Sequence, residues 1–181
     1  MTERATRLHA TADGQIAELI GLISAVNDAT LRLPCPGREK LGDGTIAASA
    51  RHTADNYQRI AEFVETSDRM SGAHEPTQRG DRRVSRSLRA VGHRPSKHAA
   101  NSPPAGEYTA DNIDLDLLAK QLAAARVALG RIAELTDSAL DAIPPKDSLT
   151  FCDGQRTLEQ VLAGLLKHQG HQVAALNAAI V

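Results

Sequence analysis

The chain has 181 residues, of which 41% are hydrophobic and 2% aromatic, and its formal net charge is −1. This length suits one domain with a sizeable core, and the near-neutral charge indicates no polyanionic partner. There is no long apolar run and no apolar region of a secretory signal near the N-terminus, so we expect a cytoplasmic protein without a membrane span. Two cysteines are too few for a disulfide framework, and we expect Cys35 and Cys152 to be unbridged loop thiols at opposite ends of the fold.

Four segments show the helical spacing of apolar residues. The first covers about residues 11–31 and ends in a stretch rich in proline and glycine. The second covers about residues 43–65, with Asp43 as its N-cap. The third begins near residue 111 and continues to about residue 142, just before two prolines. The fourth starts with a capping box, Thr157 with Gln160, and continues to the end of the chain.

No segment alternates with the period of a strand, so we expect an all-α protein with at most a short ribbon. A long polar connection, about residues 67–110, separates the second and third helices and could cross a bundle from end to end. The sequence therefore predicts one domain, residues 1–181, folded as a four-helix bundle, up-down-down-up, with a long crossover connection between helices two and three.

The connection contains the arginine cluster GDRRVSRSLR, with His74, His93 and His98 around it. It has a single aromatic residue, Tyr108, and no recognisable nucleic-acid-binding fold. We therefore expect a mobile connector and no nucleic-acid partner.

The last predicted helix contains KHQGHQVAAL, in which His168 and His171 lie three residues apart. On a helical wheel His168 lies at the edge of the apolar stripe, Gln172 within it and His171 on the far side. The pair that can converge on one point is therefore His168 and Gln172, at i and i+4, and His171 is expected at the surface. If helix four is distorted, His171 could instead replace Gln172.

His52 points inward or along the edge of the second helix, and in the predicted bundle it lies at the level of His168. Bundle interiors often hold metal sites built from facing helices, so we expect the two imidazoles within about 5 Å of each other or on one metal. The alternative is two histidines hydrogen-bonded to their neighbours. Arg51, next to His52, is expected to be solvated or to pair with Asp55 at i+4, and the alternative is that it holds an anionic ligand.

These residues resemble the DinB/YfiT-like family of bacterial four-helix metalloproteins. TIAASARHTADNY, residues 45–57, is similar to the second-helix pattern S-I-G-x-H-x-R-H-x-x-D-H-[FY] of one branch of that family. TLEQVLAGLLKHQGHQVAAL, residues 157–176, is similar to the family's last helix, which carries H-x-x-H-H. His168 and His171 fit this second motif, and Gln172 stands where the family has its last histidine.

The resemblance implies a divalent metal, often zinc or nickel, with His52, His168 and Gln172 at the ligand positions. Gln172 departs from the family because an amide oxygen is a weak ligand for an ion that prefers imidazole or thiolate. Ser49 and Asn56 also replace histidines of that branch. The metal is therefore expected to be weakly held or lost.

The resemblance also implies a metal-dependent transferase or isomerase that uses bacillithiol, mycothiol or glutathione with a small electrophile. The metal would act as a Lewis acid and stabilise the thiolate. The competing hypothesis is a non-enzymatic bundle that has lost the metal and binds a small ligand or a partner. A homodimer is a further hypothesis, since the sequence does not fix the oligomeric state.

Overall fold

The computed structural model describes residues 1–72 and 108–180, and these are almost entirely helices and the loops between them. In this part of the chain there is no strand, only an isolated antiparallel bridge between Pro34 and Thr45. The all-α class is therefore confirmed. The elements are α1 (Glu3–Ala25), α2 (Asp28–Leu31), α3 (Ile46–Gly72), η1 (Ala110–Asn112), α4 (Leu115–Leu129), η2 (Gly130–Glu134), α5 (Asp137–Asp141) and α6 (Leu158–Ile180).

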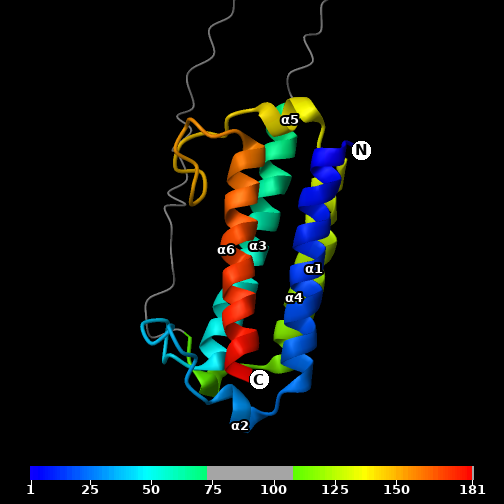
Figure 1. Cartoon of the computed structure of the whole chain (residues 1–181). Helices are drawn as coiled ribbons and strands as arrows, with labels where there is room; N and C mark the ends of the chain where they lie inside the picture. Colours follow the sequence, from blue (N-terminus) through cyan, green and yellow to red (C-terminus); the bar gives the residue numbers. More distant parts are fainter. Residues whose placement is uncertain (73–107, 181) are drawn as a thin grey trace, which may run out of the picture.

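The four long helices, α1, α3, α4 and α6, lie side by side (Figure 1). Both α1 and α3 pack against α4 and against α6. The N-terminus lies at the end of the molecule where α5 is found, and α6 ends at the opposite end, near α2 (Figure 1). None of the helices in the described residues is long and apolar enough to cross a bilayer.

Helix boundaries follow the capping side chains. Thr2 accepts a hydrogen bond from the backbone of Ala5, so α1 begins earlier than its apolar pattern suggests. The capping box predicted for α6 is confirmed: Thr157 Oγ1 accepts from Gln160 N at 3.3 Å, and Gln160 Oε1 accepts from Thr157 N at 3.0 Å.

Several other predicted boundaries are wrong. The first helix ends at Ala25 and not near residue 31, and the short α2 follows it. Asp43 is not the N-cap of α3, because Thr45 Oγ1 accepts from Ala48 N at 3.2 Å while the Asp43 carboxylate binds Thr45 itself. The third segment is not one helix to residue 142. It becomes the 3₁₀ helix η2 after Leu129, and a separate α5 is capped by Thr136.

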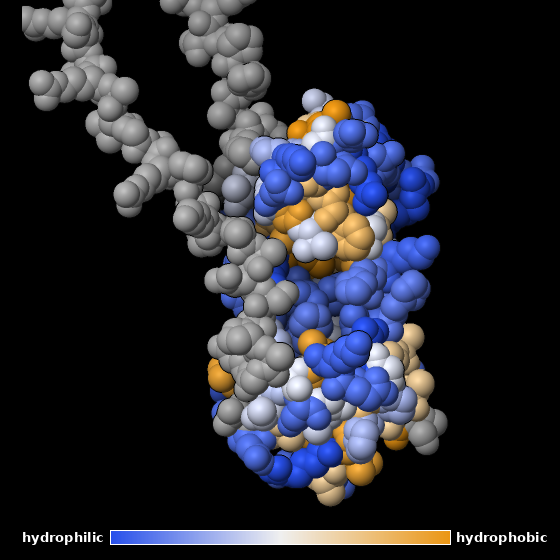
Figure 2. Space-filling view, turned by 90° about the vertical axis from the view of Figure 1, so that its left-hand side faces the viewer, coloured by the Kyte–Doolittle hydropathy of each residue, from blue (hydrophilic) through white to orange (hydrophobic). Residues whose placement is uncertain are grey.

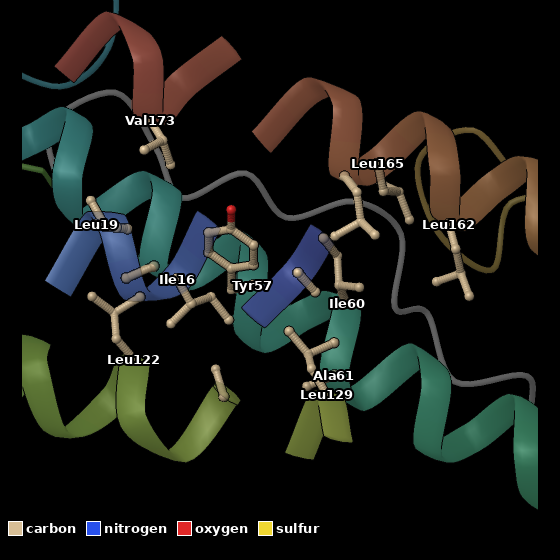
Figure 3. Packing of buried hydrophobic residues seen from close by; sticks show 14 of the residues in the cluster. Ile16, Leu19, Tyr57, Ile60, Ala61, Leu122, Leu129, Leu162, Leu165 and Val173 are labelled. Carbon is tan, nitrogen blue, oxygen red and sulfur yellow. The ribbon is translucent and has the colours of Figure 1, made fainter. Parts of the chain in front are cut away.

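The core lies between the four long helices (Figure 3). Aliphatic side chains from all four helices surround the buried ring of Tyr57. The labelled members are Ile16 and Leu19 of α1, Tyr57, Ile60 and Ala61 of α3, Leu122 and Leu129 of α4, and Leu162, Leu165 and Val173 of α6.

One polar chain crosses this core. The hydroxyl of Tyr57 donates to Gln15 Oε1 at 3.0 Å, and Gln15 Nε2 donates to the Leu166 carbonyl at 3.1 Å. Gly170 makes this approach possible, because a Cβ there would lie 2.7 Å from Gln15 Nε2. The three groups therefore fix how α1, α3 and α6 lie against one another.

The predicted connection is only partly described. α3 extends beyond residue 65 to Gly72, and the chain returns at Tyr108, which is buried. The arginine cluster and His74, His93 and His98 lie outside the described residues, so their predicted role as a connector is untested. Cys35 and Cys152 are both free and buried, which confirms the absence of a disulfide between them.

Candidate functional site

Two histidine–amide pairs lie on α3 and α6, which pack against each other. The Nδ2 atom of Asn56 is 3.0 Å from Nε2 of His52, and the Nε2 atom of Gln172 is 3.1 Å from Nε2 of His168. Each pair has the i,i+4 spacing that brings side chains together on one helix face. In both, the amide nitrogen donates and the imidazole Nε2 accepts, which leaves the ring proton on Nδ1.

The burial of these side chains follows the helical wheel in part. Gln172 is buried, with 4% of its surface exposed, and His171 is exposed, as the wheel predicts. His52 is half-buried, but His168 is exposed rather than inward. The site therefore lies at the surface edge of the contact between α3 and α6 and not at the centre of the core.

Aromatic rings flank both histidines. The ring of Tyr108 meets that of His52 edge-on, with ring centroids 5.8 Å apart. The ring centroids of Phe151 and His168 are 6.4 Å apart. Phe151 has a φ of 78°, which a bulky residue adopts only when its surroundings impose it. The loop between α5 and α6 thus holds this ring beside the histidine. This loop lies on the side of the molecule that Figure 2 presents, where an apolar area adjoins a band of polar side chains (Figures 1 and 2).

Asp55 fixes Tyr108 in this position. Its carboxylate accepts from the Tyr108 hydroxyl at 2.8 Å and from Gln121 Nε2 at 2.7 Å, and it pairs with Arg51 at 3.4 Å. The predicted i,i+4 pair of Arg51 with Asp55 is therefore confirmed. Burial, followed by the hydrogen bond and charge of Asp55, raises the pKa of Tyr108, so this hydroxyl stays protonated at neutral pH.

The electrostatic environment keeps both imidazoles neutral. Burial lowers the pKa of His52 most. The charges of Arg59 and Arg38 lower it further, as does His168 when it is protonated, and the charge of Asp55 opposes them. Burial also lowers the pKa of His168, with Arg38 and His171 adding to the effect. A proton on His168 therefore disfavours a proton on His52, and the charge of Arg38 acts on both histidines.

Unsatisfied polar atoms lie next to the two pairs. Ser49 Oγ on α3 and Gln169 Oε1 on α6 are buried and have no hydrogen-bond partner in the described part of the chain. Ser49 precedes His52 by one helical turn, and Gln169 follows His168 directly. Buried oxygens of this kind normally accept a hydrogen bond from a protein group or a water molecule.

A metal would find an incomplete ligand set here. The described residues contain no group of three or more His, Cys, Asp and Glu side chains that could hold a metal ion. His52, His168 and a rotated Gln172 amide could supply two imidazole nitrogens and one oxygen, with solvent as a further ligand. This set lacks the third imidazole or thiolate ligand that a zinc site usually has.

A small cavity lies elsewhere, between α1, α3 and α6 near α2. Its volume is about 10 Å³, and apolar side chains including Leu19, Ile46 and Leu176 line it. It is large enough for one water molecule at most and is not a ligand site.

Comparison with known proteins gives no relative: no protein-family model, no curated protein and no solved structure matches the chain.

Sequence reasoning located His52, His168 and Gln172 but missed the residues that surround them. Tyr108 belonged to a connection without periodicity, although it is the one aromatic residue there. Arg38 lies in a loop whose proline and glycine content predicts only a turn. No sequence pattern could place either residue beside a histidine of α3.

Proposed function

We propose that this chain is a DinB-like protein in which His52, His168 and Gln172 form a metal-dependent site for a low-molecular-weight thiol and a small electrophile. The observation that carries the proposal is the matched pair of neutral histidines on α3 and α6, each with its Nε2 held by an amide four residues further on.

The proposed fold is a four-helix bundle, up-down-down-up, with the connection after α3 as the crossover. Its support is the position of the helix ends. α1 and α6 begin at the end of the molecule where α5 lies, whereas α3 and α4 end there (Figure 1). A cytoplasmic location, where such thiols are found, is part of the same proposal.

The residues of the chain would act by binding and positioning. The amides of Asn56 and Gln172 orient the two rings, and the edge of Tyr108 limits how His52 can turn. Low pKa values keep the ring nitrogens free of an extra proton and able to bind an electrophilic ion. When bound, a zinc or nickel ion would stabilise a thiolate and lower the thiol pKa.

A second function is supported by one observation, the hydrogen bonds that already occupy both Nε2 atoms. A bundle that has exchanged its metal ligands for amides would bind a small polar ligand without catalysis. In this case the unsatisfied oxygens of Ser49 and Gln169 would receive donors from the ligand.

Elemental analysis of protein purified without a histidine tag, followed by calorimetric titration with zinc and nickel, tests the first function. We expect weak binding that His52→Ala and His168→Ala each abolish, while His171→Ala, a change of an exposed histidine on the same helix, leaves it unchanged. A turnover assay with a thiol and a chromogenic aryl halide then separates the two functions. If no metal binds at any attainable concentration, the non-enzymatic function replaces the first.

A further inference from the structure

The side chain of Arg38 is a half-buried cation without a carboxylate partner among the described residues. The acidic side chains next to it in the loop accept hydrogen bonds from backbone N–H groups instead. Glu39 accepts from the backbone of Gly37 at 2.8 Å, and Asp43 accepts from the backbone of Ala110 at 2.7 Å. Partial burial of a charge without a partner is unfavourable, so this guanidinium has unused capacity to bind an anion.

The loop that carries Arg38 is fixed beside the histidine pairs. The backbone of Asp43 donates to the Tyr108 carbonyl at 3.0 Å, and the ring of Tyr108 packs on His52. The nearest acid on α3 is Asp55, whose oxygens are taken by Tyr108, Gln121 and Arg51. The lowered pKa values of His52 and His168, to which Arg38 contributes, agree with this placement.

The two imidazoles add neutral donors to this charge. Because each Nε2 accepts from an amide, the ring proton is on Nδ1, and no acceptor for either Nδ1–H exists in residues 1–72 and 108–180. The guanidinium of Arg38 can balance a single negative charge, and the two Nδ1–H groups can donate hydrogen bonds to the same ligand. A carboxylate fits this set, whereas a phosphate dianion would leave one charge unbalanced.

We propose that Arg38 binds the carboxylate of a small-molecule ligand at the α3–α6 face, with His52 and His168 beside the rest of that ligand. This proposal rests on the proposed small-molecule site but does not depend on the metal. It defines the ligand class as monocarboxylates or molecules with an exposed carboxylate.

The test is a titration of metal-free, ¹⁵N-labelled protein with sodium acetate at constant ionic strength, followed by NMR at the arginine Nε–H and histidine ring signals. We expect saturable shifts of the Arg38, His52 and His168 signals with acetate and none with chloride. Phosphate should bind more weakly than acetate. Arg38→Gln should weaken acetate binding about tenfold or more, because a charged hydrogen bond is lost, and Arg38→Lys should keep part of it.

Arg131→Gln is the matched control, since Arg131 is an exposed arginine in η2. The proposal is wrong if the Arg38 signal of the wild-type protein responds to acetate no more than the Arg131 signal does, a readout that needs no variant to fold. It is also wrong if chloride gives the same shifts. If the protein binds metal but Arg38 does not respond to acetate, this inference is wrong and the proposed function stands. If Arg38 responds to acetate but no metal binds, the inference stands and the proposed metal-dependent function is wrong.

Discussion

Gly42→Ala should detach Tyr108 from the loop that carries Arg38. Gly42 has a φ of 57°, and a Cβ built there would lie 2.1 Å from the Tyr108 carbonyl oxygen and 2.7 Å from its Cβ. The obstructing atoms are the backbone carbonyl and the Cβ of Tyr108, and no rotamer change moves either of them. Either the loop or the segment at Tyr108 must move.

Gly37→Ala provides the matched control. Gly37 also has a positive φ, 78°, but a Cβ there would meet nothing within 4 Å. Both substitutions force alanine into the left-handed region, at a cost of about 1–2 kcal/mol. Only Gly42→Ala also separates Asp43 N from the Tyr108 carbonyl and Ala110 N from the Asp43 carboxylate, hydrogen bonds worth about 1 kcal/mol and about 1.5–3 kcal/mol.

We therefore expect Gly37→Ala to lower the free energy of unfolding by about 1–2 kcal/mol and Gly42→Ala by about 3.5–6 kcal/mol. Urea unfolding followed by circular dichroism measures both values. Tyrosine fluorescence adds a local readout, because the chain has two tyrosines and no tryptophan. Equal losses for the two variants, with an unchanged tyrosine signal, would show that Tyr108 is not held against this loop.

Three further predictions concern the site and the core. Zinc or nickel should raise the melting temperature of Gln172→His more than that of the wild-type protein, and His171→Ala should show the same metal-induced shift as the wild-type protein. If His171→Ala abolishes that shift, the ligand assignment on α6 is wrong. Because the pKa values of His52 and His168 are lowered in the folded state, stability should be full above the unfolded value of about 6.5 and fall as the pH drops through and below it. His52→Gln should flatten that pH dependence in urea unfolding, and an unchanged slope would contradict the cited shift. Tyr57→Phe should cost about 1–2 kcal/mol in the same assay because its half-buried amide partner, Gln15, loses a donor, and a neutral effect would mean that the polar chain does not stabilise the core.

The long helices could be predicted because their apolar residues recur at helical spacing over many turns. Their ends were harder. α6 has a side-chain capping box that can be recognised in the sequence, whereas α1 begins directly after its N-cap Thr2, ahead of its strongly apolar residues. The break after Leu129 is marked in the sequence only by Gly130, the C-cap of α4, because the apolar spacing continues past it; η2 then packs against α1.

The site shows the same division between local and non-local information. Spacing alone paired His168 with Gln172, because the i,i+4 relation is a property of one helix. The exposure of His168 depends on how far α3 and the loop around Phe151 cover it. A helical wheel describes one helix alone and cannot give this information. Tyr108 and Arg38 reach the site from separate loops joined by one backbone hydrogen bond, so only the folded chain brings them to His52.

The two proposals for this site make opposite demands on Arg38, and a single substitution can therefore test both. Its positive charge contributes to the lowered pKa of both histidines, and it would oppose a divalent cation at their nitrogens for the same reason. Arg38→Gln should strengthen zinc binding while it weakens acetate binding about tenfold or more. Calorimetric titration of wild type and variant with each ligand separately, with Arg131→Gln as control, gives both affinities. Changes of the same sign for zinc and acetate would mean that the substitution alters the fold of the loop rather than the charge at the site, and neither affinity could then be assigned to Arg38.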